Sequence, residues 1–218
     1  MSPDPASRSL RWVRPPRQAR SQETLERILD AAEALVSEKG FDDTPVSEIV
    51  QRAGSSVGAF YTRFPDKDSL IHALHERYFE QAIATADEAL EPGRWERART
   101  EEIVAAVIGF LVQIYREQNG LIRAFAVRNQ TDDGFRALRE RLSHYVSRHL
   151  AGLLATRGAE IAHEDPERAA AFGMTMVFGT LDDAMLFGDM RSGALALSDD
   201  DLAAELTRAF LAYLGVTP

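Results

Sequence analysis

The side chains whose types and spacing best suit a specific chemical role lie between residues 55 and 67. Tyr61, Thr62 and Arg63 are expected to face outward, where hydroxyls suit phosphate oxygens and a guanidinium can contact guanine O6 and N7 together. Lys67 can reach another phosphate. Small residues just before them would let the backbone approach phosphates and base edges; these are Ser55, Ser56, Gly58 and Ala59. The stretch therefore predicts contact with a nucleic acid.

A second group with possible chemistry is His72, His75 and Glu76, whose spacing places them on one helix face like the edge of a metal site. Glu160 and His163 form one Glu-x-x-His pair, whereas a di-iron bundle uses that motif twice with further carboxylates. Solvated helix residues are the favoured interpretation, so we expect no metal and no cofactor. The chain has no cysteine, which excludes disulfides, thiolate zinc sites and a cysteine nucleophile.

The sequence shows no pairing of a nucleophile with a base, so we expect a protein that is not an enzyme. Two other classes stay open on these residues alone. The chain could be a helical enzyme with a divergent front end, or a structural DNA-binding protein that takes no ligand.

Charge is divided unevenly along the chain, whose net charge is −9. Residues 1–64 carry nine Arg or Lys and nine Asp or Glu, so residues 65–218, with sixteen against twenty-five, hold the whole deficit. Five arginines against Asp4 leave residues 1–20 at +4; they are Arg8, Arg11, Arg14, Arg17 and Arg20. We expect this arm to be disordered. It either keeps the protein soluble or lies in a DNA minor groove.

The hydropathy pattern bears on membranes and on location. No apolar run approaches the roughly 18 residues of a membrane span. The basic N-terminus has no apolar segment behind it, unlike a secretory signal. We therefore expect no membrane partner and a cytoplasmic location.

Apolar spacing predicts the helices that must position residues 55 to 67. Apolar side chains recur every three or four residues from Leu25 to Val36, which predicts a helix that Gly40 ends in a left-handed conformation. Thr44 followed by Pro45 is typical of a helix start, with a hydroxyl cap before a residue that lacks an amide hydrogen. A short helix over residues 45–53 is expected to follow.

Gly54 is predicted to end that helix, and a second short helix is expected over residues 56–64, where Pro65 blocks continuation. Phe60 and Phe64 are four residues apart, so they share one face and are predicted to pack in the core. Two short helices joined by a glycine turn can place the second in the major groove of DNA.

The rest of the chain is also predicted to be helical. Asp66 is expected to cap a long helix over residues 67–90, and acids mark several later helix starts. Further helical patterns cover residues 99–117, 121–130, 133–157, 166–188 and 199–214. Since no window alternates as strands do, the expected fold is all-α with about nine helices. The predicted parts are a disordered arm (1–20), a three-helix helix-turn-helix domain (21–66) and a larger helical domain (67–218).

The stretch from residue 53 to residue 70 resembles the signature of the TetR (tetracycline-repressor) family. It departs from that pattern at Ser55, where valine is more usual, and at Arg63, where histidine or tyrosine is common. The resemblance is close over about residues 24–72, and the C-terminal two-thirds carries no motif of its own. The matching residues are Ala53, Gly54, Ser56, Gly58, Phe60, Tyr61, Phe64, Lys67 and Leu70.

The resemblance implies roles for individual residues in binding DNA. Thr44 and Ser47, at the start of the first short helix, would contact phosphates. Tyr61 and Lys67 would bind the DNA backbone. The DNA bases would be faced by the start of the recognition helix, which comprises Ser55, Ser56, Val57 and Gly58. A base contact by Arg63 is inferred from its chemistry and not from the resemblance.

The resemblance also implies that the C-terminal domain is a helical ligand-binding and dimerisation bundle. Soft apolar side chains suit an adaptable pocket for an unknown small-molecule effector; the candidates are Phe110, Tyr115, Phe125, Met174 and Phe178. The last two helices would form the homodimer; the candidate contacts are Phe172, Met176, Gly179, Leu202, Leu206, Phe210 and Tyr213. Asp182 and Asp183 interrupt this apolar region and either face solvent, which is favoured, or pair with an arginine such as Arg123 or Arg128.

Together these features imply a transcription regulator that binds a palindromic DNA operator as a homodimer. Two recognition helices about one DNA turn (~34 Å) apart would read the two half-sites. Repression, with release by a small apolar or aromatic ligand, is the common outcome in the family.

Overall fold

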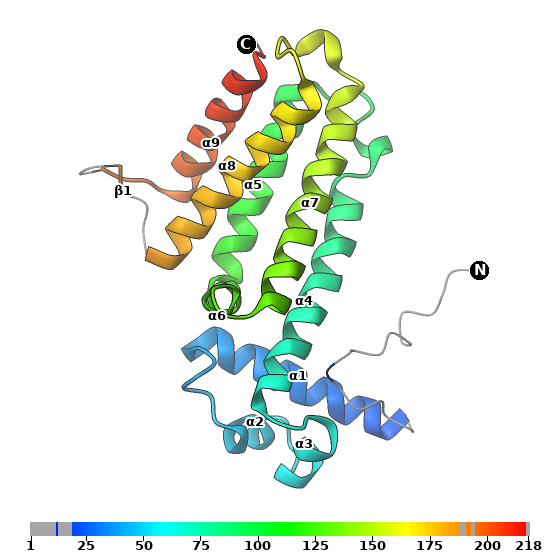
Figure 1. The fold of residues 1–218 in the computed structure, drawn as a ribbon, viewed down its shortest axis with the longest axis vertical. Coiled ribbons are helices and arrows are strands. Elements are labelled where there is room, and N and C mark those ends of the chain that lie inside the picture. Colours follow the sequence, from blue (N-terminus) through cyan, green and yellow to red (C-terminus); the bar gives the residue numbers. More distant parts are fainter. Residues whose placement is uncertain (1–11, 13–18, 188–190, 193–194, 217–218) are drawn as a thin grey trace. The chain divides into compact units, whose positions relative to one another are not determined.

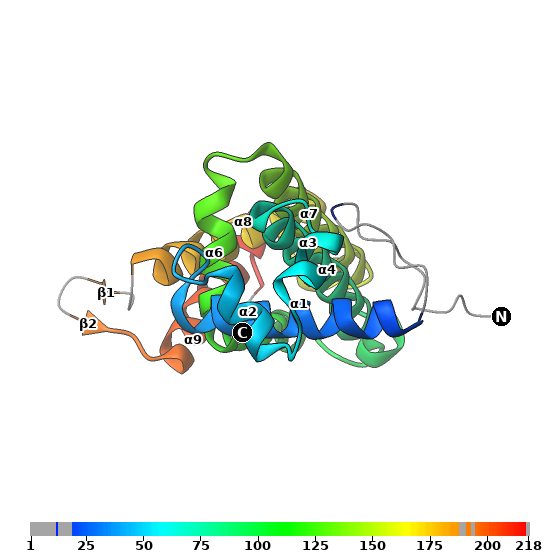
Figure 2. The ribbon, with the colours of Figure 1, turned by 90° about the horizontal axis from the view of Figure 1, so that it is seen from below.

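The computed structural model describes residues 12, 19–187, 191–192 and 195–216. Over these residues it contains nine α-helices and two short 3₁₀ helices, so the expected all-α class is confirmed. One antiparallel pair of two-residue strands, β1 (Arg191–Ser192) and β2 (Leu195–Ala196), was not predicted. Figure 2 shows these strands side by side in the connection between the last two helices. The predicted arm falls almost wholly outside the described residues.

The chain divides into two compact units, Met1–Glu80 and Gln81–Pro218. The division falls inside the long helix α4 (Lys67–Ala89), which contributes residues to both units. The backbone of α4 is therefore continuous from one unit to the other.

The first unit contains α1 (Ala19–Lys39), α2 (Val46–Arg52), α3 (Val57–Arg63) and the start of α4 (Figure 1). The predicted apolar stripe of α1 is buried throughout; it comprises Leu25, Ile28, Leu29, Ala32, Leu35 and Val36. Gly40 follows α1 with φ +83°, a left-handed conformation that L side chains rarely adopt. The predicted stop is confirmed.

The predicted start of α2 is wrong in one detail. Thr44 does not cap the helix, because its Oγ1 donates a hydrogen bond to the Gly40 carbonyl at 2.7 Å and its side chain is fully buried. Pro45 occupies the capping position, with an extended backbone and no side-chain hydrogen bond. The hydroxyl of Thr44 thus closes the turn after α1, a role that local sequence does not distinguish from a cap.

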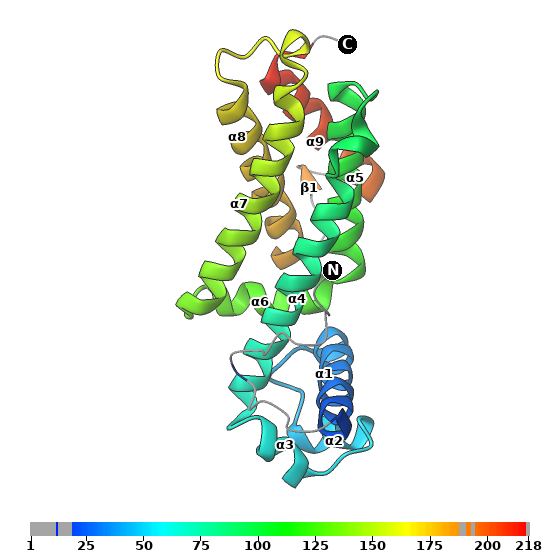
Figure 3. The same cartoon turned by 90° about the vertical axis from the view of Figure 1, so that its right-hand side faces the viewer.

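The second unit is a helical bundle of α5 (Thr100–Glu117), α6 (Asn119–Asn129), α7 (Asp133–Ala155), α8 (Pro166–Phe187) and α9 (Asp199–Leu214), preceded by η2 (Pro92–Trp95) and interrupted by η3 (Gly158–Glu160). Helix α7 runs alongside α8, and α5 packs on α9 (Figure 3). The predicted starts of the helices at residues 133 and 199 are confirmed by their caps. Asp132 accepts from the amides of Gly134 and Phe135, and Ser198 accepts from the amide of Asp201.

Two close contacts fix the interior of the second unit. A Cβ placed on Gly173 of α8 would lie 2.1 Å from a ring carbon of Phe210 on α9, so only glycine allows these helices to approach this closely. Asp182 of α8 accepts a hydrogen bond from the Tyr115 hydroxyl at 2.8 Å and pairs with Arg139 of α7. The favoured expectation that Asp182 faces solvent is therefore wrong, whereas Asp183 is exposed.

Candidate DNA-binding site

The turn between α2 and α3 depends on Gly54, whose φ of +57° is left-handed. The backbone closes it with hydrogen bonds from the Gly54 amide to Gln51 and from the Ser55 amide to Val50, at 3.1 and 2.8 Å. Ser56 then caps α3, because its Oγ accepts from the Ala59 amide at 3.1 Å. The sequence therefore forms two short helices joined by a tight, hydrogen-bonded turn, as predicted.

One face of α3 packs inward and the other faces solvent. Phe60 and Phe64 are fully buried with ring centroids 5.1 Å apart, which confirms their predicted place in the core. Val57 is 47% exposed and Tyr61 is 49% exposed. Because residues four apart share a helix face, the exposed surface of α3 is formed by Val57, Gly58, Tyr61 and Thr62, called here the reading face.

Thr62 was absent from the DNA-contacting residues predicted from the family resemblance. Its spacing of four from Gly58 is the pattern that places it on the reading face. The Thr62 hydroxyl donates to the Gly58 carbonyl at 2.8 Å, and its oxygen stays available as an acceptor.

The expectation that Arg63 faces outward is wrong, since its side chain is only 9% exposed. Its guanidinium donates to the Ala59 carbonyl at 2.8 Å, and to the carbonyl and hydroxyl of Ser21 at 3.0 and 3.2 Å. Burial, followed by the positive charge of Arg27, lowers the pKa of Arg63. Arg63 thus ties the end of α3 to the start of α1. This position argues against the base contact inferred from its chemistry.

Lys67 is also held inside the first unit. Its Nζ donates to the Phe41 carbonyl at 2.6 Å and lies 4.2 Å from the centroid of the Phe41 ring. The predicted cap of α4 is confirmed beside it, because Asp66 Oδ1 accepts from both the amide and the hydroxyl of Ser69 at 2.7 Å. These hydrogen bonds, the one from the Ser69 hydroxyl foremost, lower the pKa of Asp66.

The residues predicted to touch DNA thus divide into two groups. Thr44, Arg63 and Lys67 make internal hydrogen bonds that would have to break or be shared for a phosphate to be reached. The remaining predicted residues are exposed or half-buried on α2, the turn and α3; they are Ser47, Ser55, Ser56, Val57, Gly58 and Tyr61. This second group, with Thr62, forms the candidate site.

The predicted effector residues do not share one environment. Phe125 and Met174 are buried, Phe178 packs against the core, and Phe110 is 38% exposed. The Tyr115 hydroxyl is bonded to Asp182. An effector pocket at these positions stays a prediction.

The predicted dimer contacts also divide. Leu202, Leu206 and Phe210 are buried within the chain, where they pack against its own core, so we correct their assignment as partner contacts. Their apolar spacing is satisfied by α5 and α8. The other four, Phe172, Met176, Gly179 and Tyr213, keep exposed or half-buried surface.

Two properties of the described residues bear on other classes of function. No group of three or more His, Asp or Glu side chains among them could hold a metal ion. No helix in the same part of the chain is long and apolar enough to cross a membrane.

Comparison with known proteins gives two matches to family models that together span most of the chain. Residues 28–74 match the model for bacterial regulatory proteins of the tetR family. Residues 101–214 match the model for the tetracyclin repressor-like C-terminal domain.

Individual relatives agree with the family models. The fatty acid metabolism regulator protein of Bacillus subtilis is 24% identical over 80% of this chain and 90% of its own length. The transcriptional repressor KstR of Mycolicibacterium smegmatis is 35% identical over 33% of this chain and 35% of its own length. The crystal structure of FadR from Bacillus subtilis in complex with stearoyl-CoA superimposes with a TM-score of 0.64 at 21% identity, covering 87% of this chain and 98% of that one.

The first family model falls on α1 to α4, where the reading face lies, and the C-terminal model covers α5 to α9. These relatives are regulators and not enzymes. The chain therefore belongs to the TetR family and is a DNA-binding transcriptional regulator.

Proposed function

We propose that the protein is a repressor that binds a palindromic operator as a homodimer and is released by a small apolar or aromatic ligand. The observation that carries this proposal is the reading face of α3. There two exposed side chains, Val57 and Tyr61, stand opposite two fully buried phenylalanines on a capped helix. Such a helix can enter a major groove without disturbing the core that holds it.

Each part of the reading face suits a different part of DNA. The Tyr61 hydroxyl and the Thr62 oxygen suit phosphates or base edges, and Val57 can pack on a thymine methyl group. Gly58 has no side chain, which lets the helix backbone approach the groove closely. With Arg63 turned inward, sequence selectivity is assigned to Ser55, Val57, Gly58 and Thr62.

A homodimer is supported by apolar surface on α8 and α9. Phe172 is 49% exposed and Tyr213 is 37% exposed, and their ring centroids lie 5.2 Å apart. Small exposed residues lie on the same two helices; they include Ala171, Gly179, Ala209 and Ala212. Small residues let helices from a second copy approach closely, while the two rings would anchor the contact. A pair of seven-residue helices is also needed, since one buries too little to bind tightly.

Release by a ligand is supported by α4, which belongs to both units, and by a relative that was solved with a bound ligand. A ligand that binds preferentially to one position of α4 shifts the protein toward that state. DNA binding falls if, in that state, the reading faces of the two copies are not spaced to match the two half-sites. A relative was solved with stearoyl-CoA, which carries a long apolar chain. We propose an apolar or aromatic effector held by residues near Phe110, Tyr115, Phe125, Met174 and Phe178.

A gel shift on the DNA upstream of the protein's own gene tests the proposal. The wild-type protein should retard a fragment that contains a palindrome, and an extract that contains the effector should reverse the shift. Failure to shift any nearby palindrome at low salt would refute the repressor assignment, because electrostatic contacts are strongest there.

A further inference from the structure

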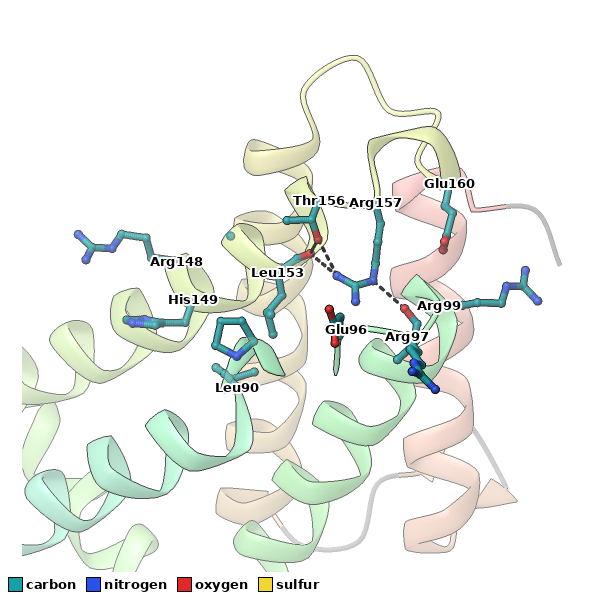
Figure 4. Close-up of a pocket in the computed structure, with 13 residues that line it drawn as sticks. Leu90, Glu96, Arg97, Arg99, Arg148, His149, Leu153, Thr156, Arg157 and Glu160 are labelled. Carbon is teal, nitrogen blue, oxygen red and sulfur yellow. Dashed lines mark hydrogen bonds between the residues drawn. The ribbon is translucent and has the colours of Figure 1, made fainter. Parts of the chain in front are cut away.

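A pocket in the second unit lies away from every residue so far assigned to DNA, effector or partner. It is bounded by the end of α4, η2, the start of α5 and the end of α7, and its volume is about 740 Å³ (Figure 4). That volume is within the range of small-molecule sites, which is about 300–1,000 Å³. None of the five predicted effector residues lines it. A ligand of this pocket would therefore be bound at a site separate from the proposed effector site.

The charge of the pocket differs in sign from that of the unit around it. Four arginines and two glutamates line it, which gives +2; they are Arg97, Arg99, Arg148, Arg157, Glu96 and Glu160. Residues 81–218 as a whole carry fourteen arginines, no lysine and twenty-one acids, which gives −7. A cationic pocket within an acidic unit selects for anions because the potential is focused there.

Arg157 is fixed in this pocket by acceptors that carry no charge. Its Nε donates to the Ala98 carbonyl at 2.7 Å, its Nη1 donates to the Leu153 carbonyl and the Thr156 hydroxyl at 2.8 and 2.7 Å, and its Nη2 donates to the Trp95 carbonyl. A guanidinium has five N–H groups, so one N–H of Nη2 has no acceptor among the described residues. The result is a half-buried, oriented cation whose contacts include no carboxylate.

Glu160, whose carboxylate interacts electrostatically with Arg157, is engaged elsewhere. Its Oε2 accepts from the Thr100 amide at 2.7 Å, at the first turn of α5. That hydrogen bond is the main cause that lowers the pKa of Glu160, and the charges of Arg99 and Arg157 contribute less. The carboxylate is thus committed to the start of α5 and leaves the charge of Arg157 only partly balanced.

The other arginines form a rim around the opening. Figure 4 shows Arg157 reaching inward, whereas Arg99 and Arg148 point outward on opposite sides. In the part of the chain that the structure describes, Arg97, Arg99 and Arg148 make no ion pair within 4.0 Å, so they can turn toward a ligand. Leu90, Pro92 and Leu153 give the same pocket an apolar wall.

We propose that this pocket binds a small organic anion, in which a carboxylate or phosphate group is joined to a compact apolar body. The anionic group meets the free N–H of Arg157 and the rim arginines, and the apolar body packs on Leu90, Pro92 and Leu153. This site stands independently of the proposed repressor function, because it makes no use of the reading face or of α8 and α9.

Fluorescence of Trp95 can test the site directly. The Trp95 carbonyl accepts from Arg157 and its indole nitrogen donates to the Ala89 carbonyl at 2.7 Å, so its ring environment reports on the pocket. The chain has two tryptophans, and a Trp12→Phe background leaves Trp95 as the only one. The probes are octanoate, hexyl phosphate and, as an uncharged match, octanol.

At least one of the two anions should saturate the Trp95 signal, and octanol should need about tenfold higher concentration, since a charge-assisted hydrogen bond is worth about 1.5–3 kcal/mol. Whichever anion binds more tightly identifies the preferred head group. Equal binding of octanol and both anions would overturn the proposal, as would a failure of both anions to bind.

Variants locate the binding to this pocket. Replacement of Arg157 endangers the fold because its hydrogen bonds join η2, the segment before α5, and α7, so the test replaces arginines of the rim instead. Arg97→Gln with Arg148→Gln should weaken anion binding about tenfold, at about threefold for each exposed charge, with unchanged circular dichroism. Arg123→Gln on α6 removes one exposed positive charge outside the pocket and should bind as the parent does. A double variant that binds as tightly as Arg123→Gln would refute the site.

Discussion

At the scale of single residues, the direction of a side chain decides what its chemistry can do. Tyr61 and Arg63 are two positions apart on α3, yet one is 49% exposed and the other 9%. A hydroxyl at an exposed position can meet a phosphate, whereas a buried guanidinium that bonds to Ser21 stabilises the first unit instead.

Tyr61→Phe removes only the hydroxyl from the reading face. Because a net hydrogen bond contributes about 0.5–1.5 kcal/mol, affinity for DNA should fall about threefold to tenfold. The loss should be similar on the operator and on an unrelated duplex, as expected for a phosphate contact, and the melting temperature should not change. Fluorescence anisotropy on both duplexes measures this. Unchanged affinity on both would contradict the contact.

Arg63→Ala should destabilise the protein and leave base preference nearly unchanged. It removes the charge-assisted hydrogen bonds that join the end of α3 to Ser21 and Ala59, at a cost of about 1.5–3 kcal/mol in the free energy of unfolding. Arg52→Ala is the matched control, since its exposed pair with Glu38 should contribute about 0–1 kcal/mol. Urea unfolding measures both variants. Equal stability of the two, with altered base preference in Arg63→Ala, would restore the base-contact role.

At the scale of elements, the helix-turn-helix depends on caps and turns that hold short helices in place. Helices of seven residues are too short to be stable alone, so α2 and α3 depend on Gly54, on the Ser56 cap and on packing against α1. Helix α4 is attached to α1 by Arg77, which pairs with Asp30 at 2.7 Å and also with Glu33.

The cap of α4 gives the first unit an acid-sensitive contact. The pKa of Asp66 in the folded state lies below its ordinary value of 3.8, so the stabilisation is present above that pH and is lost as pH falls through the folded pKa. Asp66→Ala should lower the free energy of unfolding by about 1 kcal/mol at neutral pH, and the difference from wild type should shrink below about pH 4. Urea titrations between pH 3 and 7 measure the difference.

Asp43→Ala is the control for this prediction, because Asp43 is an exposed acid in the turn after α1. Its effect on stability should be small at every pH. A difference between Asp66→Ala and wild type that grows toward low pH would contradict the assigned cap.

At the scale of the whole molecule, the proposed reading of a palindromic operator requires a second copy of the chain. Phe172→Glu places a charge in the apolar surface of α8 and should shift the protein from dimer to monomer in sedimentation velocity, since a buried unpaired charge is costly. Val127→Glu is the control, because Val127 is 55% exposed on α6, away from that surface. A Phe172→Glu protein that stays dimeric would place the interface elsewhere.

The sequence predicted the order and extent of the helices well, because apolar spacing and caps are local properties. It placed Phe60 and Phe64 in the core for the same reason. It failed where the partner is remote. Arg63 bonds to Ser21, forty-two residues away, and nothing near Arg63 indicates that contact.

Apolar spacing also does not reveal whether a helix face packs against the same chain or against a second copy. Leu202, Leu206 and Phe210 form a regular stripe that was assigned to a second copy, yet it packs inside the chain. The pocket at the end of α7 escaped prediction because its arginines come from segments about fifty residues apart.

DNase footprinting upstream of the protein's own gene, with wild type and Val57→Glu, tests most directly the claim that α3 reads DNA. Val57 is 47% exposed in the first turn of α3, where an acid suits the helix dipole, so the variant should fold while it repels phosphates. We predict that wild type protects a palindrome with half-sites about one DNA turn (~34 Å) apart and that Val57→Glu protects nothing. A folded Val57→Glu protein that gives the same footprint would contradict the account.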